Sequence, residues 1–218
     1  MLLTLKDVTL VGIDCFGESN LLHALRHATR YTSFGDIVVI IEPSKKPVYS
    51  GYRMVEHPTT TRLDYELLAA TLRGVQIETD FVLYMEADAR LVNPTAWDPK
   101  WLQYDYIGAP WPDHYLNGYP MCHKGNNVGN GGFSIRSAKI YRLVWEAVKD
   151  YADDPWLRYH DALICRTLRP WLEAHGIKFA PPEDAFRFSC EDTYYSGQFG
   201  FHGKLTAKMN GFDLTPPQ

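Results

Sequence analysis

Apolar positions in the first part of the chain follow two different periodicities. Residues 8–14 (VTLVGID) are almost continuously apolar and rich in Val and Ile, which is typical of a buried strand. Apolar residues then recur at helical spacing over residues 21–28, with Ser19 or Asn20 at the N-cap position. A second apolar run follows at residues 36–42 (DIVVIIE). The pattern predicts a βαβ unit with parallel strands and a right-handed crossover.

Further strands and helices are predicted downstream, with one irregular region between them. Residues 93–132 are rich in Pro, Gly, Asn and Trp and lack sustained periodicity, which is typical of loops and short strands around a site. A Gly-rich tail closes the chain. The predicted helices are 63–72, 138–151 and about 159–175, and the predicted strands are 52–56, 81–85, 133–136 and 186–188.

Length and composition favour a single domain. The chain has 218 residues, 45% of them hydrophobic, which is enough to bury a substantial core without disulfides. No repeat, low-complexity tract or linker divides the sequence. We therefore expect one α/β domain over residues 1–218, with a mostly parallel central sheet flanked by helices.

Charge, cysteines and hydropathy bear on partners and location. The formal charge of −4 argues against a surface that coats nucleic acid, although Arg136, Lys139, Arg158 and Arg166 leave a local basic groove open. Four widely spaced cysteines without a CxxC pair indicate thiols in a reducing compartment. The sequence shows no signal peptide and no apolar stretch near the roughly 20 residues of a membrane helix. We expect a cytoplasmic protein, bacterial or in the host cytoplasm if viral, without a membrane span. Its oligomeric state stays open.

Glu86 and Asp88 form an acid-x-acid triplet directly after the predicted strand 81–85. Open α/β sheets bind ligands at the carboxyl ends of their strands. Side chains at i and i+2 in extended or turning backbone point to one side, so both carboxylates can face a divalent cation that bridges a diphosphate. A solvated turn explains an isolated triplet as well, but the position after a buried strand favours the metal.

A glycine-rich stretch, residues 126–134, contains Asn130, Gly131 and Gly132. Its glycines permit positive φ or close approach of the backbone to a ligand, and its asparagines offer donors and acceptors. A tight turn before a strand is the alternative. The stretch lacks the GK[ST] ending of a P-loop.

Two later positions carry candidate chemistry. Asp161, near the start of a predicted helix, is a candidate general base for an acceptor hydroxyl, with His160 as the alternative. An acid at that position also interacts favourably with the helix dipole. His202 lies between glycines, where its imidazole can reach a metal while Lys204 meets phosphate, although packing is the alternative for a lone histidine. The histidines lack the HExxH spacing of zinc hydrolases.

Aromatic residues crowd the region from 97 to 119 and offer faces on which sugars or nucleobases stack. Core packing explains most of them equally well. Trp111, in the turn GAPWP, is the one expected near the site.

The sequence resembles the nucleotide-sugar-dependent glycosyltransferases of the GT-A fold, and more closely a family of small bacterial and viral proteins related to them. The stretches YDYIGAPWP and VGNGGFSIRSAK carry the more specific part of the likeness. Weaker similarities cover nearly the whole chain in the expected order. They are VGIDCFGESNLLHAL, FVLYMEADARL, HDALICRTL and FGFHGK.

The resemblance implies a GT-A-like, Rossmann-like domain that binds a divalent metal (Mn²⁺ or Mg²⁺) and a nucleotide-sugar donor. Related sequences often open the triplet with Asp and read Glu-Asp at the helix, where this chain has Glu86 and His160. By position, the resemblance assigns Glu86, Asp88 and His202 to the metal; Val11, Ile13, Asp14, Arg62 and Asp64 to the nucleotide; Asn130, Gly131 and Gly132 to the donor sugar or acceptor; and Asp161 to catalysis.

We therefore expect a metal-dependent glycosyltransferase that moves a sugar from a nucleoside-diphosphate sugar, with UDP the expected nucleotide, to an acceptor hydroxyl. The acceptor is expected on a glycan or, as in small viral members, on a hydroxymethylated DNA base. A nucleotidyltransferase is the rival enzyme class, although residues 12–17 lack the basic residues of its usual loop. A non-catalytic sugar- or nucleotide-binding module is the rival outside enzymology.

Overall fold

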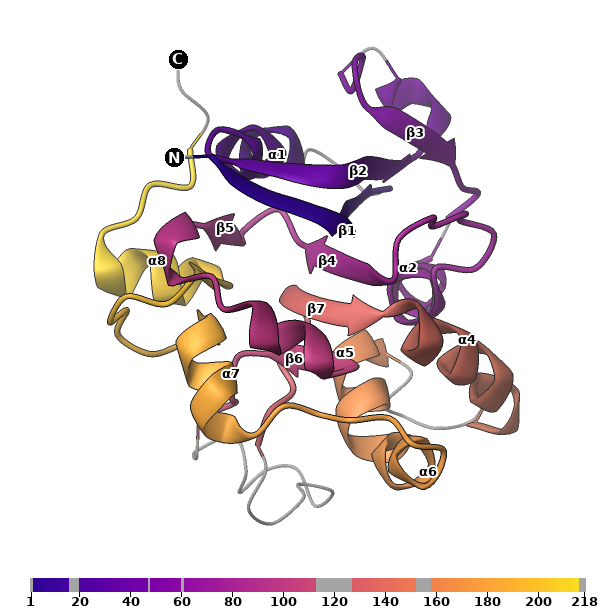
Figure 1. Ribbon diagram of the computed structural model, residues 1–218. Coiled ribbons are helices and arrows are strands. Elements are labelled where there is room, and N and C mark those ends of the chain that lie inside the picture. Colours follow the sequence, from indigo (N-terminus) through magenta and orange to yellow (C-terminus); the bar gives the residue numbers. More distant parts are fainter. Residues whose placement is uncertain are drawn as a thin grey trace.

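A six-stranded mixed sheet forms the centre of the molecule and is flanked by helices (Figure 1). The computed structural model describes residues 2–15, 20–46, 48–59, 61–112, 127–151 and 158–215. The strand order is β3-β2-β1-β4-β7-β6, with parallel pairing from β3 to β4 and antiparallel pairing at β7 and β6. The α/β class with a central sheet flanked by helices is thus confirmed. The strands are β1 (Leu3–Asp14), β2 (Thr32–Ile41), β3 (Arg53–Glu56), β4 (Phe81–Met85), β6 (Tyr106–Gly108) and β7 (Phe133–Ser137).

The βαβ unit at the start of the chain forms as predicted. Helix α1 (Leu21–Thr29) joins β1 to β2 and buries its apolar face against the sheet. Asn20 takes the N-cap position but makes no side-chain capping bond, because its backbone (φ −84°, ψ 17°) is not in the extended conformation of a capping residue. Its amide nitrogen donates to the Leu214 carbonyl at 3.4 Å. Ser19, the other candidate cap, lies outside the described residues.

The second half of the chain departs from the predicted elements in two places. The predicted helix over 159–175 is divided into α5 (His160–Ala162), a π-helical turn (Leu163–Thr167) and α6 (Arg169–Ala174). Pro170 explains the break, because it has no amide hydrogen with which to continue the α-helical ladder. The predicted strand at 186–188 is wrong.

Residues 186–188 instead end helix α7 (Pro182–Phe188). Proline at the first helical position and the acidic residues Glu183 and Asp184 in the first turn favour helix formation. A three-residue apolar-polar alternation is outweighed by these signals. The remaining elements are α2 (Arg62–Thr71), α4 (Ala138–Ala147), α8 (Lys204–Asn210), a small sheet of β5 (Arg90–Leu91), β9 (Gly200–Phe201) and β8 (Ser189–Cys190), and 3₁₀ turns at Pro43–Lys45, Pro94–Ala96, Pro99–Gln103 and Val148–Tyr151.

Strand directions bring distant segments to one edge of the sheet. β1 and β4 are parallel, so their carboxyl ends, followed by Cys15 and Glu86, emerge on the same side. β7 runs antiparallel to β4 with Met85 opposite Phe133, so the glycines that precede β7 lie at this edge as well. The Glu86 amide donates to the Gly132 carbonyl at 2.8 Å and joins the two segments. Within the described part of the chain, no helix combines the length and the apolar character needed to cross a membrane.

Helix α2 begins with a reciprocal capping box. The Thr61 hydroxyl accepts from the Asp64 amide at 3.1 Å, and the Asp64 carboxylate accepts from the Thr61 amide at 2.9 Å. Both of these backbone donors would otherwise be left without an intrahelical partner. Asp64, assigned by the resemblance to the nucleotide pocket, therefore has a structural function at the start of α2.

We expect Thr61→Ala and Asp64→Ala each to lower the free energy of unfolding by about 1 kcal/mol, because each removes one half of the box. Urea denaturation followed by circular dichroism measures the change. The exposed helical residue Glu146 provides a control in Glu146→Ala. If the two box variants were no less stable than this control, the capping interpretation would fail.

Candidate functional site

The polar residues at the carboxyl edge of the sheet line a cleft of about 390 Å³. It combines acidic side chains from the end of β1 and the turn after β4 with basic ones from α2 and α8. Its walls are Ile13, Asp14, Cys15, Asn20, Arg62, Tyr65, Glu86, Ala87, Asp88, Lys204 and Leu214. Five of the residues assigned by the resemblance to the nucleotide or the metal thus share one cleft with Lys204.

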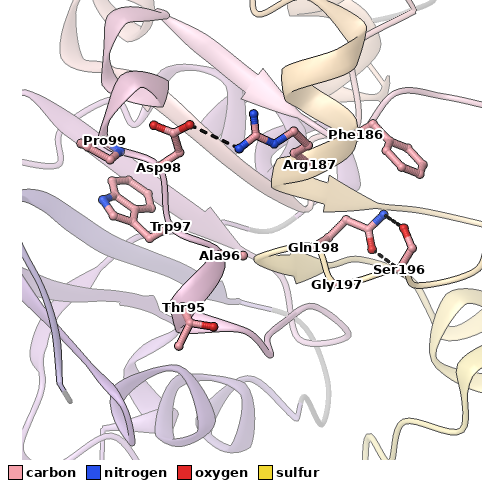
Figure 2. Close-up of a pocket in the computed structure, with 10 residues that line it drawn as sticks. All are labelled: Thr95, Ala96, Trp97, Asp98, Pro99, Phe186, Arg187, Ser196, Gly197 and Gln198. Atoms are coloured by element: carbon pink, nitrogen blue, oxygen red, sulfur yellow. Dashed lines mark hydrogen bonds and ion pairs between the residues drawn. The ribbon is translucent and has the colours of Figure 1, made fainter.

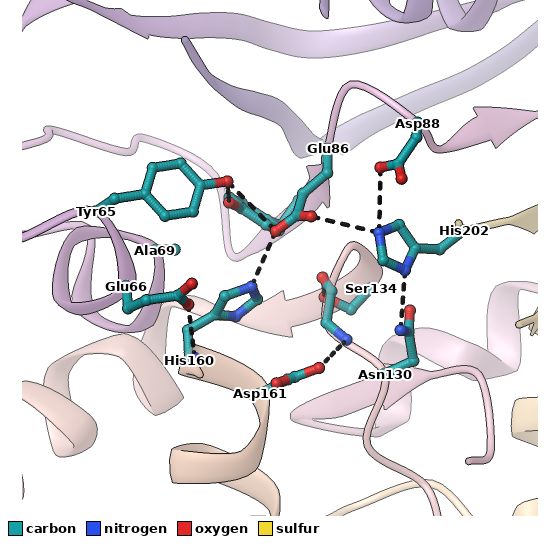
Figure 3. A network of polar contacts seen from close by, with 12 residues as sticks. Tyr65, Glu66, Ala69, Glu86, Asp88, Asn130, Ser134, His160, Asp161 and His202 are labelled. Carbon is teal, nitrogen blue, oxygen red and sulfur yellow. Dashed lines mark hydrogen bonds and ion pairs between the residues drawn. The ribbon is translucent and has the colours of Figure 1, made fainter. Parts of the chain in front are cut away.

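Two acidic residues of this cleft, Glu86 and Asp88, converge with His202. Glu86, Asp88 and His202 each offer one ligand atom, and these atoms lie within 4.8 Å of one another. The His202 Nε2 atom lies 3.3 Å from a carboxylate oxygen of Glu86 and 3.3 Å from one of Asp88 (Figure 3). Among the described residues this buried nitrogen has no hydrogen-bond partner of acceptable geometry. An imidazole nitrogen aimed between two carboxylates fits a divalent cation.

The glycines before β7 make room for the side chains of the site. A Cβ atom on Gly132 would lie 2.2 Å from His202 Nε2, and one on Gly131 would lie 2.3 Å from the His160 ring. A Cβ on Gly129 would lie 2.1 Å from the Trp111 ring. None of these three glycines has positive φ. The close backbone approach predicted for this stretch is therefore an approach to the protein's own rings.

His160 is held between a buried cation and a carboxylate. Arg136, which is fully buried, donates to His160 Nδ1 at 3.0 Å. Because a guanidinium only donates, this contact fixes Nδ1 as the acceptor and Nε2 as the protonated nitrogen. Nε2 then donates to Glu86 at 3.2 Å (Figure 3). His160 thus orients Glu86, and both of its ring nitrogens are occupied.

Glu66 on α2 binds the backbone of His160. Its carboxylate accepts from the His160 amide at 2.9 Å and forms an ion pair with Arg62. The Glu66 side chain is 1% exposed, and burial raises its pKa although His160 and Arg62 act in the other direction. A chain of contacts therefore runs from α2 through His160 to the carboxylate of Glu86.

The electrostatics favour an ionised Glu86. Burial alone would raise the pKa of Glu86, but the hydrogen bond from His160 and the imidazole of His202 at 3.3 Å outweigh it and hold the pKa well below its usual value. The pKa of Asp88 is also lowered, because the contact with His202 exceeds the effect of burial. Both carboxylates are therefore charged at neutral pH.

Asp161 faces the glycine-rich segment. One carboxylate oxygen accepts from the Gly131 amide at 3.2 Å and the other from the Ala162 amide at 2.8 Å. The neighbouring Asn130 places its amide nitrogen 3.0 Å from His202 Nδ1 (Figure 3). Asn130, Gly131, Gly132, His160 and Asp161 thus belong to one polar network with the three candidate metal ligands.

Asp14 presents a buried acceptor to the cleft. Its Oδ2 atom accepts from the Tyr49 hydroxyl at 2.7 Å and lies 3.6 Å from the Lys45 ammonium. Its Oδ1 atom is buried and has no hydrogen-bond partner among the described residues. Val11, in contrast, is fully buried in the core and does not line the cleft.

The residues considered for a basic groove divide into two groups. Arg136 is fully buried, and Arg166 is 3% exposed with its guanidinium 4.0 Å from the centre of the Trp111 ring. Lys139 and Arg158 are exposed. Trp111 is therefore stacked on Arg166 and lies outside the cleft lining, and two of the four cations are not at the surface.

A larger cavity of about 460 Å³ lies elsewhere, between α7 and the segments 95–99 and 196–198 (Figure 2). Its polar groups contact one another. Asp98 lies 3.5 Å from Arg187, and the Gln198 side chain bonds to both the amide and the hydroxyl of Ser196. It has no cluster of candidate metal ligands among the described residues. Size therefore favours this cavity, but chemistry favours the cleft at the sheet edge.

Several residues of the network carry no local sequence signal. Glu191 contacts His202 from the position directly after the two-residue strand β8, and Arg136 reaches His160 from within β7. Tyr65 donates to Glu86 from α2 at 3.3 Å. Apolar and polar residues alternate in β7 (FSIRS), so the local pattern does not indicate that Arg136 is buried.

The profile of a family described as "Protein of unknown function (DUF5672)" matches residues 70–202, more than half of the chain. The chain belongs to the DUF5672 family. The matched segment contains Glu86, Asp88 and Asp161 and ends at His202. No curated protein matches the sequence of this DUF5672 protein significantly.

Solved structures show weak overall similarity to the DUF5672 chain. The bifunctional IspDF from Campylobacter jejuni is 16% identical with a TM-score of 0.48, and the alignment covers 80% of this chain but only 48% of that one. The 4-diphosphocytidyl-2C-methyl-D-erythritol synthase from Anaerococcus prevotii is 10% identical (TM-score 0.43; 80% and 87% covered). A glycosyltransferase involved in glycosylation of the major capsid of PBCV-1 is 12% identical (TM-score 0.45; 89% and 91% covered). Similarity at this level assigns no substrate.

We expect Gly132→Ala to weaken Mn²⁺ binding at least about 10-fold, because the added methyl group displaces the His202 ring from the two carboxylates. Overpacking should also lower the free energy of unfolding by about 1–3 kcal/mol. Titration of Mn²⁺ by electron paramagnetic resonance measures the affinity.

Gly74→Ala is the matched control, since its methyl group meets no atom within 4 Å while its φ of 76° strains an alanine. It should lower stability and leave Mn²⁺ affinity unchanged. Equal Mn²⁺ affinities in the two variants would contradict the conclusion that Gly132 makes room for the His202 ring.

Proposed function

We propose that this protein is a metal-dependent glycosyltransferase that moves a sugar from a nucleoside-diphosphate sugar to an acceptor hydroxyl. The observation that carries the proposal is the convergence of His202 with Glu86 and Asp88, two residues of a cleft that Arg62 and Lys204 also line. A divalent cation beside two basic side chains is suited to a diphosphate. The resemblance of the sequence to GT-A glycosyltransferases supports the same assignment.

The nucleoside would occupy the part of the cleft formed by the end of β1. The buried Asp14 Oδ1 atom offers an acceptor for a ribose hydroxyl or a base N–H group. Ile13 and Cys15 line the cleft on either side of it. A uridine nucleotide is the donor we propose to test first.

The chain's own residues would act on both sides of the reacting bond. When bound, the cation would neutralise charge on the departing diphosphate. Arg62 and Lys204 would add positive charge at the phosphates. Asp161 would accept the proton of the acceptor hydroxyl. At the same time, the hydroxyl oxygen would form a bond to the anomeric carbon, and the bond from that carbon to the diphosphate would break.

His160 is less suited than Asp161 to be the base. Its Nδ1 accepts from Arg136 and its Nε2 donates to Glu86, so neither nitrogen is available to take a proton from an acceptor. We propose that His160 orients Glu86. For the acceptor we favour a glycan hydroxyl over a DNA base, because burial of Arg136 and Arg166 removes half of the cations considered for a basic groove.

We expect the protein with Mn²⁺ to release nucleoside diphosphate slowly from one nucleotide-sugar in a panel, even without acceptor. Asp88→Asn and Asp161→Asn should lower turnover about 100-fold or more. Asp98→Asn, in the cavity beside α7, is the matched control and should retain the wild-type rate. Turnover is followed by chromatography of the released nucleotide.

Other products would point to the rival functions. Release of pyrophosphate from a nucleoside triphosphate would indicate a nucleotidyltransferase. Tight nucleotide-sugar binding without any turnover would indicate a binding module. Wild-type turnover in Asp88→Asn would remove the metal from the mechanism.

The roles of the adjacent residues 160 and 161 can be separated by experiment. We expect His160→Gln to weaken Mn²⁺ binding, because it disturbs Glu86, and Asp161→Asn to lower kcat with Mn²⁺ affinity unchanged. Titration of Mn²⁺ and steady-state kinetics on both variants give the comparison. The opposite pattern would make His160 the base.

A further inference from the structure

Glu191 lies beside His202 because of the pairing of two short strands. β8 and β9 are parallel, with Ser189 opposite Gly200 and Cys190 opposite Phe201. The next residues in this register are Glu191 and His202, and the His202 amide donates to the Cys190 carbonyl at 3.1 Å. The Glu191 carboxylate thereby reaches within 2.9 Å of His202 Nδ1. Both side chains are largely buried, at 14% and 15% exposure.

The two neighbours of His202 Nδ1 require opposite states of this nitrogen. A carboxylate only accepts, so the contact with Glu191 requires a proton on Nδ1. The amide nitrogen of Asn130, 3.0 Å from the same atom, only donates and requires Nδ1 to be bare. Rotation of the Asn130 amide would turn its Oδ1 atom, which has no hydrogen-bond partner among the described residues, toward Nδ1 and remove the conflict.

The state of Nδ1 decides what Nε2 can do. A neutral imidazole with its proton on Nδ1 has a lone pair on Nε2, whereas the other tautomer carries a proton on Nε2 and cannot bind a cation through that atom. Nε2 is the atom that lies 3.3 Å from both Glu86 and Asp88.

We propose that Glu191 is a positioning residue that holds His202 with the proton on Nδ1, so that the Nε2 lone pair joins Glu86 and Asp88 in binding the cation. This inference rests on the metal site of the proposed function. When its amide nitrogen faces the ring, Asn130 instead favours the tautomer with Nδ1 bare and the proton on Nε2. Loss of Glu191 therefore shifts His202 toward the tautomer that donates to Glu86 and Asp88 and excludes the cation.

The same contact influences which metal is bound. Carboxylates alone suit Mg²⁺ and Mn²⁺, whereas an imidazole ligand adds affinity for Mn²⁺, Co²⁺ and Zn²⁺. If Glu191 makes the imidazole available, its loss reduces Co²⁺ and Mn²⁺ affinity more than Mg²⁺ affinity. A general disturbance of the fold would instead weaken all of these ions together.

The test measures Mn²⁺, Co²⁺ and Mg²⁺ affinity of the full chain by calorimetry for wild type, Glu191→Ala and His202→Ala. We expect Glu191→Ala to weaken Mn²⁺ and Co²⁺ binding about 10- to 100-fold, with a smaller loss for Mg²⁺. Glu183→Ala, on the exposed first turn of α7, is the matched control and should bind all three ions like wild type. Thermal unfolding establishes that each variant is folded.

A second variant tests the tautomer directly. In Glu191→Ala combined with Asn130→Asp, a carboxylate again faces Nδ1, and we expect Mn²⁺ affinity to recover. In the Zn²⁺-loaded wild type, ¹⁵N spectra of the imidazole should show a proton on Nδ1 and a ligated Nε2.

The outcomes separate the two proposals. Wild-type Mn²⁺ affinity in Glu191→Ala, absence of recovery in the double variant, or a ligated Nδ1 would each overturn the role of Glu191 while leaving the metal site intact. Absence of Mn²⁺ binding in the wild type would overturn the metal site and, with it, this inference.

Discussion

The attraction between His202 and two carboxylates is the interaction around which the site is organised. Glu86 and Asp88 carry like charges on one short turn, and their mutual repulsion opposes the arrangement. His202 lies 3.3 Å from both. Burial alone would lower the pKa of His202, but its contacts with Asp88, Glu191 and Glu86 raise it, so without a cation the charged imidazole offsets that repulsion, and a bound cation would take over this role when Nε2 gives up its proton. The folded chain thereby places residues 200–214 against the end of β4, and Lys204 and Leu214 from this segment form part of the cleft wall.

Two series of buried polar contacts hold the carboxylates from opposite sides. On one side, Arg136 fixes the proton of His160, which holds Glu86. On the other, Glu191 contacts His202. A buried charge is tolerated only where it is paired and hydrogen-bonded, so each of these groups constrains the next. The glycines before β7 are part of the same construction, because a methyl group on Gly131 or Gly132 would displace one of the two rings. Together these supports explain how a site built from loop residues is held at a fixed geometry.

The acid pair, the glycine-rich stretch and the buried strands that frame them were predictable from local pattern. An apolar run such as FVLYM forms a strand wherever a sheet can bury it, and an acidic pair that follows it lies at the sheet edge. Residues 186–188 show where prediction from such a pattern fails. The proline and the acidic residues at positions 182–184 favour a helix, and residues 186–188 form its last turn.

The sequence by itself determined the α/β class, the order of the first strands and helices, and the presence of two carboxylates at the end of β4. It did not determine the role of Asp64, which caps α2, nor the partners of His202. Only the tertiary structure paired β8 with β9 and brought Glu191 to the imidazole, because two-residue strands carry no periodicity and are fixed by contacts distant in the chain. Only the tertiary structure enclosed Arg136 and so revealed which nitrogen of His160 bears the proton, since a hydrogen-bond partner is set by proximity in space and leaves no spacing in the sequence.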